Sequence, residues 1–257
     1  MLNYMRSEIY RIIRSRSFYI CAGILCGIVL LLHIALMIGG AIEPDFKYNT
    51  VRFSLNNFVA QPFIMVILGA VIAGTLFNED RKSGVLKTTV AYGISRETIL
   101  IGKCIVSLLT AVLLLLVVLV FYVACAFLTL REPEWLPVQQ MLLAIAASLP
   151  SAIASLIFGN AIFMLCRREM TAILWWALLF YGIPMAFFFI GLKFELFERI
   201  SEWMPYIFLR MGVGVSMNTY NSIWDTAGGM LHCIAAGAIG SVIFLIWGTL
   251  RLRRLEV

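Results

Sequence analysis

Six long apolar runs limit what this sequence can fold into. They cover residues 17–39, 58–77, 99–130, 141–166, 171–192 and 230–250. Each is long enough to cross the hydrocarbon core of a bilayer, which takes about 20 helical residues. None alternates like a barrel strand, and only helices and closed barrels satisfy their backbone hydrogen bonds in lipid. The sequence therefore predicts an all-α membrane protein with six transmembrane helices, forming a single domain over residues 1–257.

The composition agrees with this class. Hydrophobic residues make up 62% of the chain and charged residues only 13%, whereas charged residues are about a quarter of a soluble domain. The net charge of +6 comes from basic residues that flank apolar runs, so we expect no nucleic acid partner. The six cysteines lie within or beside the runs and form no CxxC pair, so we expect no metal site.

The distribution of basic residues predicts the orientation. Six crossings place both termini on one side of the membrane. Fourteen of the 20 Lys and Arg residues lie in the N-terminal segment, in segment 77–103, in the pair 167–168 and in the C-terminal tail. Because cytoplasmic loops are enriched in Lys and Arg, this side, with both termini, is expected to be cytoplasmic.

Three segments depart from a plain span. Residues 1–16 place apolar side chains on one helical face and arginines mostly elsewhere, which predicts an interfacial amphipathic helix. The alternative, a signal peptide, is disfavoured because the next run of about 23 residues exceeds the 7–15 residues of a signal core. The run 99–130 exceeds the bilayer thickness, so we expect it to tilt or to project into the cytoplasm, and Lys103 near its start favours projection.

The outer segment 193–229 is too apolar for a free loop and too interrupted for a span. It predicts an amphipathic helix at 195–204, then a re-entrant piece broken by Pro205, Gly212 and Gly214. A separate signal lies in the fourth run, where small residues recur at helical spacing and predict close helix packing rather than a polar transport surface. These residues are Ser148, Ser151, Ser155 and Gly159.

Motifs for catalysis and for ion coupling are missing from the sequence. It contains no GxxxxGK[ST] phosphate loop, no HExxH and no GxSxG. No Asp, Glu, Lys or Arg lies in the middle third of any run, where ion-coupled transporters keep ionisable groups. Any uphill transport must therefore draw its free energy from another polypeptide. An alternative is an intramembrane redox subunit with a haem between His33 and His232.

The polar segment 78–98 is the cytoplasmic loop best suited to receive such a partner. Ser83 can cap a short helix, Gly93 suits a left-handed C-terminal cap, and Ser95 can cap the next helix with Glu97 in its first turn. A short helix joined through a glycine corner to the third span would act as a lever. The alternative is a solvated loop that only fixes the topology.

This segment also carries a family resemblance. The pattern Phe77-x-x-Asp80-x-x-x-Gly84, then Lys87, then Gly93-Ile94-Ser95-Arg96-x-x-Ile99-x-x-x-Lys103, resembles the loop between the second and third spans in permease subunits of type-two ABC transporters. The six spans, the N-terminal helix and the segment before the last span extend the likeness over nearly the whole chain. Val85 stands where threonine is common.

The resemblance implies that this loop docks on a separate ABC ATPase subunit. The coupling residues that it implies are Asp80, Gly84, Val85, Leu86, Lys87, Gly93, Ser95, Arg96 and Lys103. Two permease copies, expected as a homodimer, would enclose the path above two ATPase subunits. ATP and magnesium would bind to those subunits, so this chain would carry no cofactor and no catalytic residue.

The family also implies a location and a class of cargo. Small members lie in the bacterial plasma membrane and include exporters of antimicrobial or other amphipathic peptides. We therefore expect export of such peptides or of hydrophobic compounds by alternating access. By analogy with the family, the candidate path residues are Gln61, Met65, Phe180 and Phe187. A non-transporting membrane anchor for a cytoplasmic protein is the remaining alternative.

Overall fold

The fold is a bundle of long helices with a small irregular cap at one end. It is seen in a computed structural model that describes residues 10, 14, 16–43, 45–83, 91–93, 95–166, 168–215 and 220–254. The α-helices are α2 (Arg16–Ile42), α3 (Val51–Val59), α4 (Ile64–Ser83), α6 (Arg96–Thr129), α7 (Leu136–Leu165), α8 (Glu169–Ala177), α9 (Ile183–Gly191), α10 (Glu195–Glu202) and α11 (Ala227–Arg253). Five described helical spans are long and apolar enough to cross a membrane, and the bent pair α3–α4 makes up to six. The prediction of an all-α membrane protein is thereby confirmed. The N-terminal helix predicted over 1–16 lies almost wholly outside the described residues.

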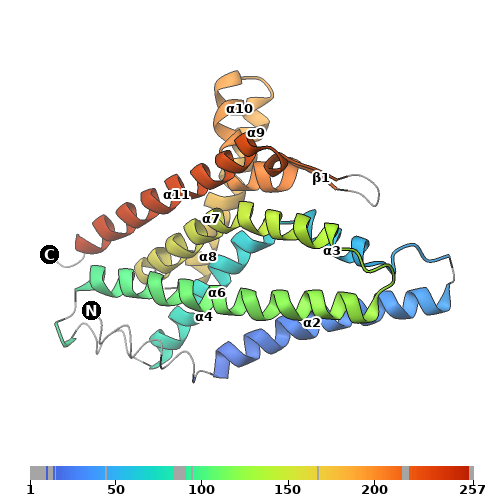
Figure 1. Cartoon of the computed structure of the whole chain (residues 1–257). Helices are drawn as coiled ribbons and strands as arrows, with labels where there is room; N and C mark the ends of the chain where they lie inside the picture. The colour runs from blue at the N-terminus through green and yellow to red at the C-terminus, as the bar shows by residue number, and fades with distance from the viewer. Residues whose placement is uncertain are drawn as a thin grey trace.

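Helix α7 lies at the centre of the bundle, between α4 and α11 (Figure 1). Glycines allow both neighbours to approach its backbone closely. A Cβ on Gly69 of α4 would lie 2.5 Å from the carbonyl oxygen of Ala152, and one on Gly237 of α11 would lie 2.4 Å from the carbonyl carbon of Pro150. Small residues drive helix association in membranes in this way, because they let dispersion contacts form between backbones.

The small-residue face of α7 serves packing, as predicted. The Ser155 hydroxyl donates a hydrogen bond to the carbonyl oxygen of Val66 on α4 at 2.7 Å, and accepts one from Nε1 of Trp176 on α8 at 2.8 Å. A Cβ added to Gly159 would lie 2.9 Å from the Cβ of Ala73 on α4. One serine thus ties three spans together at a point where their backbones are close.

The predicted second span, 58–77, is not a single helix. The chain bends by 68° between α3 and α4. Pro62 explains the break, because it lacks an N–H and disfavours helical geometry at the preceding residue, Gln61. Helix α4 then continues to Ser83, past the expected end of the span at 77. Ser83, expected to cap a short helix, is the last residue of α4, and the residues directly after it fall outside the described chain.

The fifth span, expected over 171–192, runs continuously from Glu169 to Gly191. Its centre is a π-helical turn, η1 (Leu178–Gly182), between α8 and α9. Pro184 follows in the first turn of α9 and has no N–H to donate into a regular α-helical ladder. A π-turn is a common local adjustment and is enriched at functional sites.

The segment before the last span forms the cap. It contains α10, a second π-helical turn η2 (Ile207–Met211), strands β1 (Val213–Val215) and β2 (Tyr220–Ser222), and a 3-10 turn η3 (Ile223–Asp225). The strands pair antiparallel, with Val213 opposite Ser222. The amphipathic helix predicted from residue 195 is present, and the hairpin was not predicted. Phe208 and Leu209 of η2 are buried, so this end of the segment belongs to the core.

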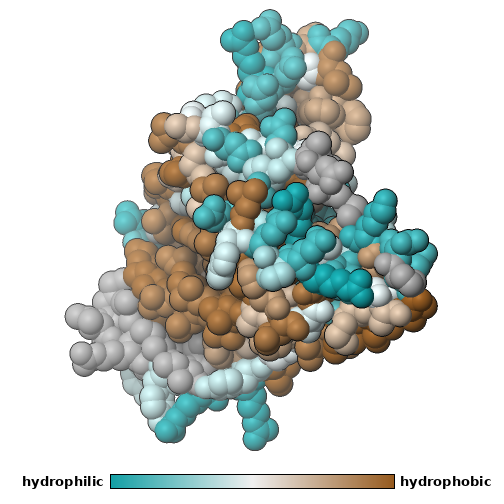
Figure 2. Space-filling view, turned by 45° about the vertical axis from the view of Figure 1, so that its right-hand side comes forward, coloured by the Kyte–Doolittle hydropathy of each residue, from teal (hydrophilic) through white to brown (hydrophobic). Residues whose placement is uncertain are grey.

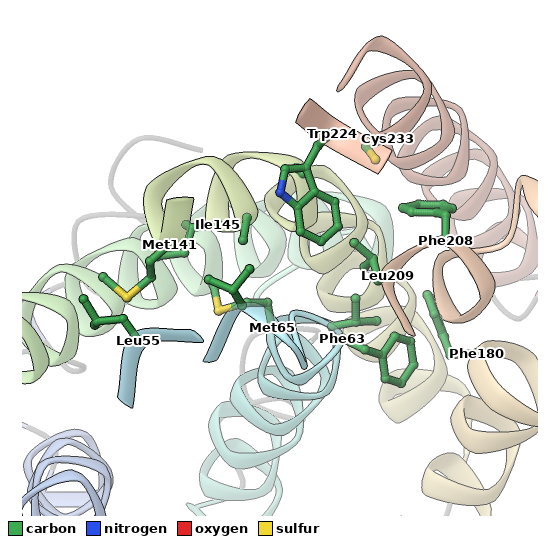
Figure 3. Close-up of a cluster of buried hydrophobic side chains, with 14 of the residues drawn as sticks. Leu55, Phe63, Met65, Met141, Ile145, Phe180, Phe208, Leu209, Trp224 and Cys233 are labelled. Carbon is green, nitrogen blue, oxygen red and sulfur yellow. The ribbon is translucent and has the colours of Figure 1, made fainter. Parts of the chain in front are cut away.

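Apolar side chains cover much of the molecular surface as well as its core. Figure 2 shows apolar residues over much of the left and lower part of one face, with hydrophilic residues at the top, at the bottom edge and in a patch right of centre. Inside, one cluster of buried residues links α3, α4 and α7 to the cap. Figure 3 shows Leu55 and Met141 toward one end of this cluster and Phe180 and Phe208 toward the other.

Candidate functional site

The candidate site is the corner that leads into α6, and its described part has the predicted geometry. Gly93 has φ +80°, in the left-handed region that other residues avoid. Ser95 is extended and caps α6, and its hydroxyl accepts a hydrogen bond from the N–H of Thr98 at 3.3 Å. Arg96 is therefore the first residue of the helix. The predicted order of glycine corner, serine cap and helix is present.

The first turns of α6 are wedged between α7 and α11. Leu100 is fully buried in a small cluster with Ala161 of α7 and Leu252 of α11. A Cβ on Gly248 of α11 would lie 2.9 Å from the Cβ of Ala161 and 3.1 Å from Cδ2 of Leu100. Because close-packed interiors yield little, a displacement of the corner has to move α7 and α11 or break this contact.

An ion pair joins the start of α6 to the end of α11. Both carboxylate oxygens of Glu97 accept hydrogen bonds from the guanidinium of Arg253, and the Nη2–Oε2 distance is 3.0 Å. Glu97 lies at the positive end of its helix dipole and Arg253 at the negative end of its own, so each charge also suits its helix. Glu97 was predicted as a first-turn acid, but its partner Arg253 was not, because only the meeting of α6 and α11 brings the two together.

Lys103 lies two turns into α6 and is only 5% exposed. Its side chain is therefore packed within the bundle, and the projection of this end of α6 into the cytoplasm stays a prediction. A short polar chain continues from it along the interface with α7. The Ser107 hydroxyl donates to the Lys103 carbonyl oxygen at 2.6 Å, and Nδ2 of Asn160 donates to the Ser107 hydroxyl at 2.9 Å. Buried polar groups of this kind need a defined geometry, which makes this interface specific.

The other predicted coupling residues lie at or beyond the limit of the described chain. Asp80 falls within α4, as part of the helix that runs to Ser83. Gly84, Val85, Leu86 and Lys87 fall outside the described residues. Their role in docking stays a prediction. Helix α6 spans 34 residues, or about 51 Å, against about 30 Å for the hydrocarbon core, so it exceeds the core as expected.

The four candidate path residues do not line one cavity in the single chain. Met65 and Phe180 are both buried in the main apolar cluster, and Phe180 stacks on Trp176 with ring centroids 5.4 Å apart. Gln61 is exposed at the break before α4. Phe187 is half-buried against Phe197 of α10, with centroids 5.3 Å apart. A lining role for them stays a prediction.

His33 is locked into a hydrogen-bond network. Its Nδ1 lies 2.7 Å from the carbonyl oxygen of Val29, which requires a proton on Nδ1, so Nε2 accepts from the Ser54 hydroxyl at 3.1 Å. Tyr122 of α6 donates to the Ser54 carbonyl oxygen at 2.8 Å. The network ties α2, α3 and α6 together beside the bend.

His232 has entirely different neighbours. Its ring packs at a tilt against Trp203, with 4.2 Å between centroids, and its Nε2 lies 3.0 Å from the carbonyl oxygen of Glu202. His33 is buried with both ring nitrogens in hydrogen bonds, so in this structure neither of them is open to a haem shared with His232. The part of the chain that the structure describes also holds no group of three His, Cys, Asp or Glu residues suited to a metal.

Comparison with known proteins gives one match. The family model described as "ABC-2 family transporter protein" matches residues 45–248. This range includes the corner, the start of α6 and all or most of five of the six candidate spans. No curated protein and no solved structure matches the chain.

Proposed function

The chain belongs to the ABC-2 family of transporter proteins, and from this premise we propose that it is the membrane subunit of an ATP-driven exporter of amphipathic peptides or similar hydrophobic compounds. It is a multi-pass membrane permease, and the family works with an ABC ATPase as partner. The proposed cargo and the ATP-driven mechanism rest on the sequence and on the geometry at the start of α6. Export by alternating access, with both termini in the cytoplasm of a bacterial cell, is part of the proposal.

The observation that carries the proposal is the rigid connection between the corner and the bundle. Gly93 and Ser95 set the direction in which α6 starts, and Leu100 is buried one turn later between α7 and α11. A push at the membrane surface is thereby passed to two other spans instead of being absorbed by a flexible loop. Segment 78–98 is the proposed docking element for the ATPase.

The proposed assembly contains two copies of this chain and two ATPase subunits. The apolar windows of α2, of α8–α9 and of α11 are each only 11% buried within one copy, so these faces need lipid or another subunit to cover them. A path between two copies along the second and fifth spans would use Gln61 and Phe187 first, since they are accessible in the single chain. ATP and magnesium would bind to the ATPase subunits.

Charge reversal at the corner tests the proposal. The chain is co-expressed and reconstituted with its partner ABC ATPase, and transport-coupled ATP hydrolysis is measured. We expect Arg96→Glu to abolish coupling without loss of membrane insertion. Arg16→Glu is the matched control, because Arg16 is an exposed arginine at the start of α2 outside the docking segment. Normal coupling by Arg96→Glu would show that the corner takes no part in coupling. Placement of Arg96 outside the cell would refute the proposed orientation.

The same preparation separates the proposal from a membrane anchor. An anchor recruits the cytoplasmic ATPase, but candidate cargo peptides leave ATP hydrolysis unchanged. The exporter predicts that amphipathic peptides stimulate hydrolysis and accumulate across the membrane only when ATP is present. Uphill accumulation by the permease reconstituted without any ATPase would contradict the proposal.

A further inference from the structure

A groove separates the fifth and sixth spans. It lies beside α7, between the α8–η1–α9 span and α11, and has a volume of about 700 Å³, within the range of small-molecule sites. Its apolar wall includes Trp175, Leu178, Ile243 and Trp247, and Arg251 and Arg254 lie at one end. We refer to it as the arginine-ended groove.

One stripe of α11 forms a graded wall of this groove. Residues 243, 247, 251 and 254 recur at spacings of four, four and three, so they share one helical face. Along this face the side chains change from aliphatic to aromatic to cationic. The stripe is about 16 Å long at 1.5 Å per residue, close to half of the roughly 30 Å hydrocarbon core. The groove therefore has the length and polarity gradient of one bilayer leaflet.

The charges at the end of the groove are uncompensated within the described chain. Arg251 and Arg254 are exposed, and no described carboxylate forms an ion pair with either of them. No acidic residue is among the described residues that line the groove. Arg253, between them in sequence, faces away and pairs with Glu97. The helix dipole alone would favour arginine at the end of α11, but it does not account for two free cations facing one apolar groove.

The groove is also open to its surroundings. Trp175, Leu178 and Ile243 are 53%, 47% and 55% exposed, although all three belong to membrane-spanning helices. In a bilayer such a surface is in contact with acyl chains. Two tryptophans, Trp175 and Trp247, line the groove, and tryptophan is enriched where a span meets the headgroups.

We propose that the arginine-ended groove binds an anionic phospholipid of the leaflet at the C-terminal end of α11, with the phosphate between Arg251 and Arg254 and an acyl chain along Trp247 and Leu178. Guanidinium groups recognise phosphate through paired N–H donors, and basic pockets between spans hold anionic headgroups. A bound lipid would fill the space between the fifth and sixth spans and set their separation. The inference requires neither the proposed cargo nor the ATPase partner.

Lipid titration of the full chain tests this site. The delipidated protein is titrated with phosphatidylglycerol or with phosphatidylcholine of the same acyl chains, and bound lipids are counted by native mass spectrometry. We expect the wild-type chain to bind phosphatidylglycerol about 10- to 30-fold more tightly, from two arginines that each attract an anionic headgroup. Arg251→Gln/Arg254→Gln should lose this preference. Arg16→Gln/Arg168→Gln should keep it, since it removes two exposed arginines that do not line the groove.

Three results would overturn the inference. Equal binding of both lipids by the wild-type chain would show that the arginines select nothing, and an unchanged preference in Arg251→Gln/Arg254→Gln would place the lipid elsewhere. Displacement of the lipid by an equal concentration of inorganic phosphate would indicate a site for a free anion.

A second variant tests the apolar part of the groove without changing charge. Leu178→Trp fills the groove from a half-exposed position, so we expect weaker binding of both lipids. The elution volume of the variant in size-exclusion chromatography should be unchanged. Loss of a dimer in the same spectra, with lipid binding intact, would identify a second copy of the chain as the occupant and refute the lipid.

Discussion

Gly93 has φ +80°, and no atom lies within 4 Å of the position that a Cβ would occupy there. A substitution at this residue therefore changes the backbone preference of the corner and creates no clash. For alanine, the left-handed conformation costs about 1–2 kcal/mol. Since about 1.4 kcal/mol is a factor of ten, Gly93→Ala should lower the ratio of native to non-native corners by roughly 5- to 30-fold.

This shift should appear as weaker docking of the ATPase. The apparent dissociation constant rises in proportion as the competent conformation becomes rarer, so we expect an increase of up to about 5- to 30-fold for Gly93→Ala. Gly93→Asn should bind more tightly than the alanine variant, because asparagine tolerates the left-handed region better. Gly93→Pro should abolish docking, since proline holds φ near −65°.

The assay is titration of the purified ATPase subunit onto each permease variant in nanodiscs. Gly228→Ala serves as the control, since Gly228 also has open space around an added Cβ but has no positive φ. If the alanine variant binds as tightly as the wild type, or the asparagine variant binds more weakly than the alanine variant, then the left-handed corner does not control docking.

Three further predictions concern contacts between helices, and each is tested by thermal unfolding of the purified chain. Glu97→Gln and Arg253→Gln should show a coupling of about 0.5–1 kcal/mol in a double-mutant cycle, because Arg253 is exposed and Glu97 only partly buried. Strictly additive effects would argue against the pair. Gly237→Ala should cost about 1–3 kcal/mol by forcing α11 away from α7, whereas Gly27→Ala, with open space, should cost nothing; equal effects would contradict the close approach. His33→Ala leaves the buried Ser54 hydroxyl without its imidazole partner and should cost about 1–3 kcal/mol; an unchanged melting temperature would show that the network is unimportant.

Local features of the corner could be predicted because they depend on neighbouring residues. A glycine followed shortly by serine and a first-turn acid indicates a left-handed residue, a cap and a helix start, and Gly93, Ser95 and Glu97 take these places. The bend at Pro62 was equally local, since proline breaks helices, but the apolar run around it concealed the break. Helix α4 continues through the polar residues to Ser83, and the capping role expected of Ser83 stays a prediction because residues 84–90 fall outside the described chain.

Contacts between spans could not be predicted in the same way. A hydropathy pattern identifies a span but does not say which face meets which neighbour. The pairing of Glu97 with Arg253 and the burial of Lys103 follow from the meeting of α6, α7 and α11. The network around His33 likewise needs α2, α3 and α6 in one place.

The membrane setting, the number of spans and the glycine corner could thus be predicted from the sequence alone. Apolar run length and helix capping depend only on residues within a few turns of one segment. The packing around α7, the ion pair that closes the wedge and the groove that ends in Arg251 and Arg254 were settled only when the helices came together. Their geometry depends on contacts between residues far apart in the chain, and local preferences carry no information about such contacts.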